Sequence, residues 1–389
     1  MSRRLATTGL FVVNGAVIGA WVSQIPSIQR RFDLSSSEIG LIILCMALAV
    51  ILAVPVAGQA VARRGSGPVA VAGGFACLVA VNLPVLAPHP LLVAAGLVAL
   101  GGASAAMDVA MNSHGVAIEN EGNGPIMSSL HAGWALGGVM GAGAGAAGAA
   151  LGVDGRVTVA VVVLALAALL AACAPRLGHG SAAEGDRAAP FTRPSRGVAL
   201  LATLCLLVMM TEGAMADWSG IYMRSDLESS AALAALAYAV FTAGMMGGRL
   251  VGDRVNRRVG PVALLRGGAV LTAVPLTAML LVGSPAVAMA SLFLVGLGVA
   301  NGVPLMFSAA GRQPGTAPGP GIAAVSSTGS IGFLLGPPII GFLAGATALP
   351  WALAVLVPAA VAVLLLARRA TGPPASGAPA PAAAALRAG

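Results

Sequence analysis

The sequence predicts an all-α integral membrane protein with 12 transmembrane helices in two pseudo-symmetric six-helix bundles. Three observations predict this fold class: a very apolar composition, a series of long apolar stretches, and arginines that come mostly in short clusters between them. Of the 389 residues, 58% are hydrophobic and only 9% are charged, whereas an ordinary soluble domain carries roughly 25% charged residues. This supply of charge is too small to cover a water-exposed surface, so lipid is the expected solvent.

The apolar stretches are each long enough to cross a bilayer, because a spanning helix needs about 20 mostly apolar residues. The longest polar interruption, 174–196, divides them into six and six. The stretches cover residues 6–26, 39–61, 69–87, 91–113, 125–150, 157–173, 197–222, 231–252, 261–282, 286–308, 320–346 and 349–367. We therefore expect an N-terminal half over 1–173, a cytoplasmic linker over 174–196, a C-terminal half over 197–368 and a disordered cytoplasmic tail over 369–389.

The arginines fix the orientation. All 21 basic residues are arginine. With both termini in the cytoplasm, only Arg30, Arg31, Arg156 and Arg224 fall on the outer side of the membrane. Positive residues accumulate in cytoplasmic segments, so the sequence predicts a multi-pass membrane protein with both termini inside.

Several function classes are excluded by composition and motif. The sequence pI of about 10.8 is compatible with nucleic-acid binding, but the arginines form short clusters between apolar runs and not one patch. No nucleotide-binding loop, hydrolase elbow or zinc-protease motif is present. The cysteines lack metal-ligand spacing. We expect no enzyme activity, no cofactor, no metal and no nucleic-acid partner.

Glycines recur at four-residue spacing in two of the expected spans. One series contains Gly133, Gly137, Gly141 and Gly145, and the other contains Gly244, Gly248 and Gly252. This spacing places each series on one helix face, where helices approach closely in lipid. Either static packing or a sliding interface would use such a face.

Two loops occupy equivalent places in the two halves and carry similar motifs. Residues 58–68 read GQAVARRGSGP, and residues 247–261 read GGRLVGDRVNRRVGP. With the six-plus-six arrangement, these loops resemble the signature of the major facilitator superfamily of secondary transporters. Three longer stretches resemble a bacterial subgroup of uncharacterised or sugar-permease-like facilitators: 107–119 running on to 124–138, then 212–223, then 321–341. This resemblance implies a location in a bacterial inner membrane.

The resemblance implies a conformational latch in both loops. The first copy lacks the expected acidic residue, because Ala62 stands in its place. The second copy is more complete, and a plain positive-inside anchor is the alternative for both. The implied latch residues are Arg63, Arg64, Gly65, Gly248, Arg249, Asp253, Arg254, Arg257 and Arg258.

Ionisable side chains within membrane spans are costly and are functional candidates by default. Glu212 is the strongest candidate for a proton carrier, at an expected depth in the outer part of the hydrocarbon core. Asp217 lies near the outer interface, where an anchoring role is the alternative. Asp108 and His131 could form a proton path or an inner gate, or else a hydrogen-bonded seam between two helices.

Polar and aromatic side chains within the spans are candidates for substrate binding, although a lone aromatic usually serves packing. The substrate-binding candidates are Asn14, Trp21, Gln24, Asn112, Trp134, Tyr238 and Asn301. Arg249 is expected at the inner end of its span, within the loop motif. Because no arginine is expected at mid-depth, a strongly anionic substrate is disfavoured.

The resemblance implies a secondary transporter that moves a small organic solute by alternating access. Proton-linked symport of a sugar or similar neutral polar metabolite is the first hypothesis. Export of a drug or secondary metabolite is the alternative within the class, and a non-transporting membrane sensor is the alternative outside it. The expected partners are the solute, protons and the lipid bilayer. Each chain is expected to act as a monomer, since it encloses its own pathway.

Overall fold

The computed structural model describes residues 2–118, 126–178, 195–310, 312–313 and 318–371. Within these ranges all regular secondary structure is helical. The first half of the chain contains α1 (Arg3–Arg31), α2 (Ser36–Arg64), α3 (Ser66–Ala80), α4 (Asn82–Leu86), α5 (Pro90–Ile118), α6 (Met127–Ala150) and α7 (Gly155–Leu177). The second half contains α8 (Arg196–Ile221), the π-helical turn η2 (Tyr222–Asp226), α9 (Ala231–Val282), α10 (Pro285–Val299), α11 (Gly302–Ala310), α12 (Pro318–Ala346), α13 (Leu349–Ala354) and α14 (Leu356–Thr371).

The helices form a multi-pass membrane architecture. Among the described residues, 10 helical segments are long and apolar enough to cross a membrane. This number is lower than the expected 12 for two reasons. The 52-residue α9 is counted once, although its backbone leaves the helical region at Gly260 (φ 81°). The glycine-rich α6, with 24 residues, is not among the 10.

Local sequence explains where several helices begin. The side chain of Ser35 accepts a hydrogen bond from the Glu38 N–H, and the Glu38 carboxylate accepts one from the Ser35 N–H at 2.8 Å. This capping box satisfies backbone donors that the first helical turn leaves free. Ser195 and Ser230 cap α8 and α9 with one hydrogen bond each: the serine hydroxyl accepts from the N–H of Val198 or Leu233. The helix starts therefore agree with the apolar stretches to within a few residues.

The glycine series pack helices within each half. A methyl group added at Gly137 or Gly141 would collide with the α1 carbonyls of Val12 or Ala16. In the second half, Gly244 has the same relation to the carbonyl of Phe293 in α10. Each series thus allows close backbone contact between two helices of one half. These contacts favour static packing over a sliding interface.

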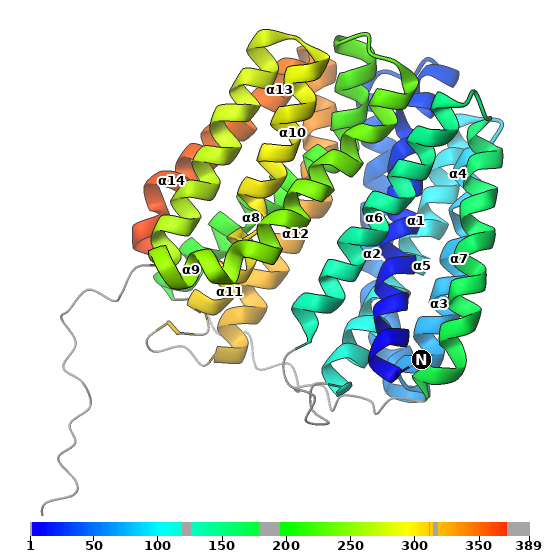
Figure 1. Ribbon diagram of the computed structural model, residues 1–389, viewed down its shortest axis with the longest axis horizontal. Helices are drawn as coiled ribbons and strands as arrows, with labels where there is room; N and C mark the ends of the chain where they lie inside the picture. The colour runs from blue at the N-terminus through cyan, green and yellow to red at the C-terminus, as the bar shows by residue number, and fades with distance from the viewer. Residues whose placement is uncertain (1, 119–125, 179–194, 311, 314–317, 372–389) are drawn as a thin grey trace, which may run out of the picture.

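The two halves form separate helix groups that approach each other at one end of the molecule (Figure 1). We call the end that holds the first turn of α1 the near end, and the other the far end. Contacts between halves run from α2 to α12 and from α6 to α9. Near the far end, a Cβ atom added at Gly40 would lie 3.0 Å from the Cα atom of Gly341, and one added at Gly220 would lie 3.0 Å from the ring of Pro26. The backbones therefore meet closely there.

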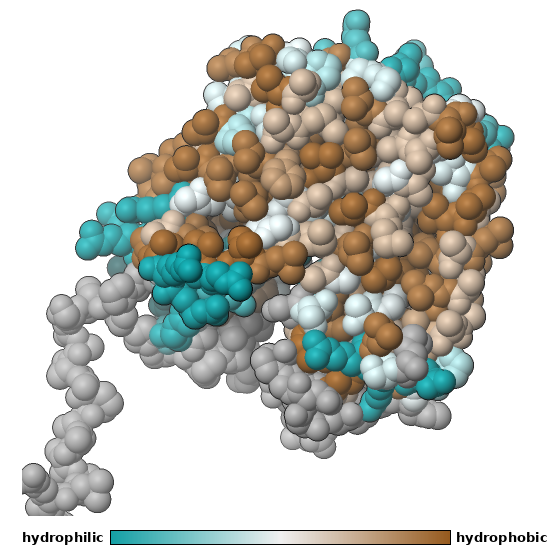
Figure 2. Space-filling model, in the orientation of Figure 1, coloured by the Kyte–Doolittle hydropathy of each residue, from teal (hydrophilic) through white to brown (hydrophobic). Residues whose placement is uncertain are grey.

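At the near end the halves diverge, and the surface between them is hollowed (Figure 2). Apolar side chains cover much of the visible surface at the middle of the molecule (Figure 2). Among the exposed apolar residues of the described chain, Leu52, Leu164 and Leu281 are each at least 70% exposed. Such a large exposed apolar surface fits contact with lipid. Two polar side chains are also exposed, Asp108 in the interior of α5 and His131 in the second turn of α6.

Candidate functional site

The candidate site centres on an ion pair between two helices of the second half. The Nη2 atom of Arg249 in α9 donates to the Oε1 atom of Glu212 in α8 at 3.4 Å. Glu212 is buried, with 7% of its surface exposed, and the Arg249 side chain is 24% exposed. The Nε atom of Arg249 also donates to the Ala300 carbonyl at 3.5 Å. The arginine thus joins α8, α9 and the segment between α10 and α11.

This pairing corrects the depths expected from the sequence. Glu212 was expected in the outer part of the core and Arg249 at the inner end of its helix. Their contact means that both lie at a similar depth, at least nine residues from any end of their helical segments. At 1.5 Å per residue, this is about 13 Å of helix. The estimate for Arg249 failed because the first part of α9 continues to Gly260, past the apolar stretch 231–252 that was used to measure it, whereas α8 coincides with its stretch to within one residue.

His131 faces this pair from the first half. Its ring stands edge-on to Phe11 of α1, with centroids 5.2 Å apart. The charge of Arg249 acts on the His131 ring across the junction between α6 and α9. The two halves are therefore coupled electrostatically here, with His131 on one side and Arg249 on the other. Sequence reasoning missed Phe11, which carries no polar group to identify it.

Two substrate-binding candidates bond to each other beside His131. The Nε1 atom of Trp134 in α6 donates to the Oδ1 atom of Asn14 in α1 at 2.9 Å. Asn14 is buried, and Trp134 is half-buried. This bond fixes the Trp134 ring relative to α1, so the tryptophan can offer an oriented aromatic face.

Tyr238 lies where α6 and α9 cross, farther from the near end than Arg249. A Cβ atom added at Gly138 would lie 3.6 Å from the Tyr238 hydroxyl and 3.5 Å from the Thr242 methyl group. Tyr238, Thr242, Met245 and Arg249 have helical spacing that places them on one face of α9. This spacing in the sequence could have indicated that Arg249 and Tyr238 lie on the same face of one helix.

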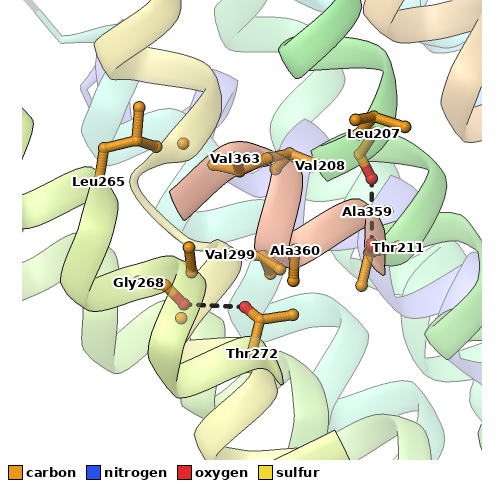
Figure 3. Close-up of a pocket in the computed structure, with 13 residues that line it drawn as sticks. Leu207, Val208, Thr211, Leu265, Gly268, Thr272, Val299, Ala359, Ala360 and Val363 are labelled. Atoms are coloured by element: carbon orange, nitrogen blue, oxygen red, sulfur yellow. Dashed lines mark hydrogen bonds between the residues drawn. The ribbon is translucent and has the colours of Figure 1, made fainter. Parts of the chain in front are cut away.

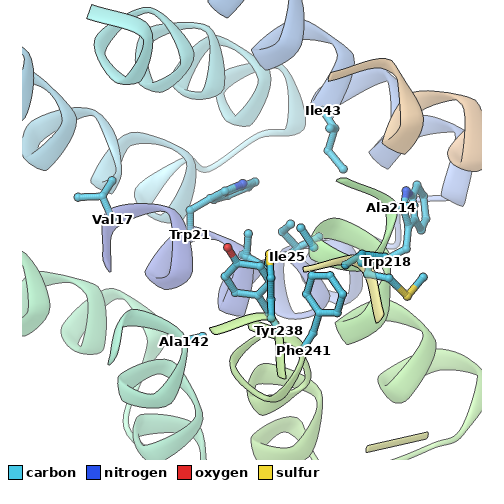
Figure 4. Packing of buried hydrophobic residues seen from close by; sticks show 14 of the residues in the cluster. Val17, Trp21, Ile25, Ile43, Ala142, Ala214, Trp218, Tyr238 and Phe241 are labelled. Carbon is cyan, nitrogen blue, oxygen red and sulfur yellow. The ribbon is translucent and has the colours of Figure 1, made fainter. Parts of the chain in front are cut away.

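An apolar plug, made of Trp21, Ile25, Trp218, Tyr238 and Phe241, closes the space beyond the ion pair. Figure 4 shows these side chains gathered from α1, α8 and α9. Each is at most 3% exposed. The Nε1 atom of Trp218 donates to the Pro337 carbonyl of α12 at 2.9 Å. Trp21, expected to bind substrate, is therefore part of a seal in this conformation.

Asp217 and Gln24 lie away from the ion pair. Asp217 is half-buried, and its charge acts on the Tyr238 hydroxyl. Within the part of the chain that the structure describes, Asp217 forms no ion pair. The Nε2 atom of Gln24 donates to the Ser23 hydroxyl at 3.1 Å, and its side chain packs against Gly155 of α7. Gln24 thus packs inside the first half.

Asp108 and His131 are not brought into contact. The Nδ2 atom of Asn112 donates to the Oδ1 atom of Asp108 at 3.1 Å, one helical turn along α5. His114 instead contacts Ser66, with 3.0 Å between its Nδ1 atom and the serine Oγ atom. The expected path from Asp108 to His131 is therefore replaced by an Asp108–Asn112 pair and a separate His131–Phe11 contact.

Asn301 stands at a break between α10, which ends at Val299, and α11, which begins at Gly302. Its Nδ2 atom donates to the Gly248 carbonyl at 2.9 Å, and its side chain fills the space beside Gly252. Gly248, which was expected to belong to the latch, lies inside α9. A Cβ atom added at Gly248 would lie 2.6 Å from the Cβ atom of Ala300. Both residues hold α9 against the broken helix.

The two loop motifs contain glycines of matching conformation. Gly65 has φ 83° and ψ 158°, and Gly260 has φ 81° and ψ 164°. Positive φ favours glycine, so each motif ends in an equivalent backbone turn. The remaining side chains implied for the latch are exposed: Arg63, Arg64, Asp253, Arg254, Arg257 and Arg258.

A separate apolar pocket lies within the second half, between α8, α9, α10, α11 and α14 (Figure 3). Its polar side chains, Thr211 and Thr272, donate to the carbonyls of Leu207 and Gly268 in their own helices, at 3.0 and 2.9 Å. None of the residues that line it is ionisable. The pocket therefore suits apolar contacts and offers no recognition of a polar solute.

Comparison with known proteins agrees with this architecture. The model of the Major Facilitator Superfamily matches residues 6–319. The chain is 31% identical to an uncharacterized MFS-type transporter of Yersinia pestis, over 88% of this chain and 89% of that protein. It is 32% identical to the membrane protein MosC of Rhizobium meliloti, over 91% of this chain and 86% of that one.

Solved structures show the same fold at low sequence identity. A mutant of the nucleoside transporter NupG has a TM-score of 0.75 at 11% identity, over 95% of this chain and 100% of that one. A bacterial homolog of the human lysosomal transporter Spinster, in an inward-facing and occupied conformation, has a TM-score of 0.68 at 17% identity, over 95% and 94%. This chain therefore belongs to the Major Facilitator Superfamily of transporters.

Proposed function

We propose that this protein is a proton-coupled secondary transporter of a small polar organic solute, with Glu212 as the proton carrier. The Glu212–Arg249 ion pair is the observation that carries the proposal. It is buried among apolar helices, where ionisable groups are rarely kept without a function. It also lies close to the junction of the two halves, where carriers of this general design bind their solutes.

Protonation would change the bonding of this pair. An ionised Glu212 holds the Arg249 guanidinium, whereas a protonated Glu212 no longer attracts it electrostatically. The proton would therefore release Arg249 to a solute or to a new position, which links proton binding to the solute site. His131 and the Asn14–Trp134 pair supply the facing wall from the first half. Asp108, Asp217 and Asn112 are secondary candidates, for proton passage or solute contact.

The transport cycle would alternate between two arrangements of the halves. The contacts at Gly40–Gly341 and Pro26–Gly220, with the apolar plug, support a conformation closed at the far end and open at the near end. If the positive-inside rule applies, the near end is cytoplasmic, as are both termini. In this proposal α6 and the two parts of α9 complete 12 crossings, in a monomer of the bacterial inner membrane. The loop motifs would act as latches between the two arrangements.

The earlier preference for a neutral sugar loses one of its grounds, because Arg249 lies next to Glu212 and not at a helix end. Export of an apolar drug or secondary metabolite is the alternative within the class. A non-transporting sensor is supported only by the incomplete first loop motif.

Substrate-evoked proton flux tests the proposal. Purified protein in vesicles with a trapped pH-sensitive dye would be exposed to sugars, amino acids, organic acids and cationic drugs. We expect one class to evoke proton uptake that Glu212→Gln abolishes. Glu228→Gln is the matched control, because Glu228 is exposed in the turn after η2. Flux that survives in Glu212→Gln would assign coupling to another group, and solute uptake without proton flux would exclude proton coupling.

A further inference from the structure

We infer that the transported solute carries a carboxylate, and that this carboxylate takes the place of Glu212 on Arg249 when Glu212 binds its proton. The inference rests on the proposed function. It goes further by naming the chemical class of the solute, a small organic monoanion. It also reverses the expectation from the sequence, which disfavoured anions because no arginine was placed inside the core.

The positive charge of Arg249 needs a negative partner, because the site is largely buried. In the observed arrangement Glu212 and Arg249 neutralise each other. A proton on Glu212 removes the negative charge and leaves the Arg249 guanidinium without a counter-ion inside the membrane. An unpaired buried charge is strongly unfavourable, even where a paired one is tolerated. A solute carboxylate restores neutrality, whereas a neutral solute does not.

The geometry of Arg249 leaves it available for a second partner. It has a single contact of 3.4 Å with Glu212, longer than the 2.7–2.9 Å typical of charge-assisted hydrogen bonds. The guanidinium has five N–H donors in a planar fork that suits a carboxylate. The contacts to Glu212 and to the Ala300 carbonyl occupy two of its nitrogens. Its side chain is 24% exposed, so a solute can reach it.

The other ionisable groups near the pair support a monoanion. On α6, His131 lies within electrostatic range of Arg249, and a ring N–H of His131 is a possible donor to a bound carboxylate. On α8, the remaining ionisable groups are Arg196 at the start of the helix, Cys205 and Asp217, and Asp217 would repel a second negative charge. On α9, the Tyr238 phenol is near both acids. Helices α10, α11 and α12 carry no ionisable side chain.

The inference predicts an electroneutral cycle, because one proton and one monoanion cross together. Proton symport with a neutral solute would instead move one positive charge in each cycle. The two cases are separated by measuring proton uptake and membrane potential in the same vesicles. The probes are lactate, gluconate and galacturonate, with propanediol, glucose and galactose as neutral counterparts of similar size.

We expect at least one acid to evoke proton uptake without a change in membrane potential, and its neutral counterpart to evoke none. Arg249→Gln should raise the half-saturating concentration of that acid at least tenfold. Arg368→Gln, a change at an exposed arginine in the last turn of α14, should leave it unchanged. Arg249→Lys, which keeps the charge, should recover part of the affinity.

Three results would overturn the inference in distinguishable ways. Proton uptake with a neutral probe, accompanied by a positive-inward current, would keep the proposed coupling and exclude the carboxylate solute. Acid uptake that is unaffected by Arg249→Gln would exclude Arg249 as its binding residue. Failure of every probe to move would instead contradict the proposed transport function, and the inference with it.

Discussion

Arg249 donates to Glu212 at 3.4 Å across the interface between α9 and α8, although 37 residues separate them in the chain. The pair lies among helices whose other residues are almost all apolar. Each of its members therefore depends on the other for neutralisation. This dependence has consequences for stability as well as for transport.

Removing one member of the pair should be more damaging than removing both. Arg249→Met leaves the Glu212 carboxylate without its cation, and breaking a buried pair costs about 3–5 kcal/mol. The lower end is expected, because the Arg249 side chain is 24% exposed. Replacing both members by residues of similar size, Glu212→Gln with Arg249→Met, should cost less than Arg249→Met alone. Thermal unfolding of the three variants in one detergent measures the difference, and additive losses would contradict the mutual dependence.

Asn301 should act on stability and not on solute recognition. Its amide donates to the Gly248 carbonyl at 2.9 Å and holds α9 against the break between α10 and α11. Asn301→Ala removes this bond and should cost about 1 kcal/mol, the net value of a typical hydrogen bond. We expect a lower unfolding temperature with an unchanged half-saturating solute concentration. A tenfold change in that concentration at unchanged stability would restore Asn301 to the solute site.

The family and the all-helical membrane fold could be predicted from the sequence, because the bilayer imposes a length and an apolar composition on each span. The number of 12 crossings stays a prediction, since 10 segments of the described residues qualify as spans. The expected stretch 39–61 and the observed α2 (Ser36–Arg64) illustrate the agreement. The expected and observed ranges differ at the helix ends, because the helices continue past the apolar stretches into polar residues and arginines. Gly260 defines the boundary between the two parts of α9 through its backbone conformation, which hydropathy does not register.

The candidate site was predictable only residue by residue. Glu212 stands out because an acid in an apolar stretch is conspicuous. Its ion pair with Arg249 depends on how α8 and α9 are shifted along each other. No periodic pattern in a single sequence gives this shift. The Asn14–Trp134 bond likewise joins residues 120 positions apart. Only the contacts between helices show which candidates lie together. Asp108 and His131, for example, do not contact each other.

The bond between Trp134 and Asn14 should orient the tryptophan for solute contact. Trp134→Phe keeps an aromatic ring but removes the donor that holds it at 2.9 Å from Asn14. We expect weaker solute binding with an unchanged proton stoichiometry, since Glu212 is untouched. Trp351→Phe is the control, because Trp351 is 73% exposed in α13. Equal transport constants for Trp134→Phe and the unmodified protein would assign the Asn14 bond to packing alone.

The close contact of Gly40 with Gly341 should determine how completely the far end closes. A Cβ atom at position 40 would lie 3.0 Å from the Cα atom of Gly341 and 3.3 Å from the Pro338 carbonyl. Both obstacles are backbone atoms of α12, so they cannot rotate away as a side chain can. Gly40→Val should therefore separate α2 from α12 and shift the population toward a conformation open at the far end.

Spin labels at the exposed far-end positions Leu151 and Ser225, one in each half, would report this shift as a longer distance. Gly58→Val is the matched control on the same helix, since a Cβ atom at Gly58 meets no atom within 4 Å. The control should keep the distance of the unmodified protein. An unchanged distance in Gly40→Val, with the protein folded, would mean that α2 and α12 can separate locally without opening the halves. The seal would then depend on the apolar plug around Trp218 and Tyr238 more than on the glycine contact.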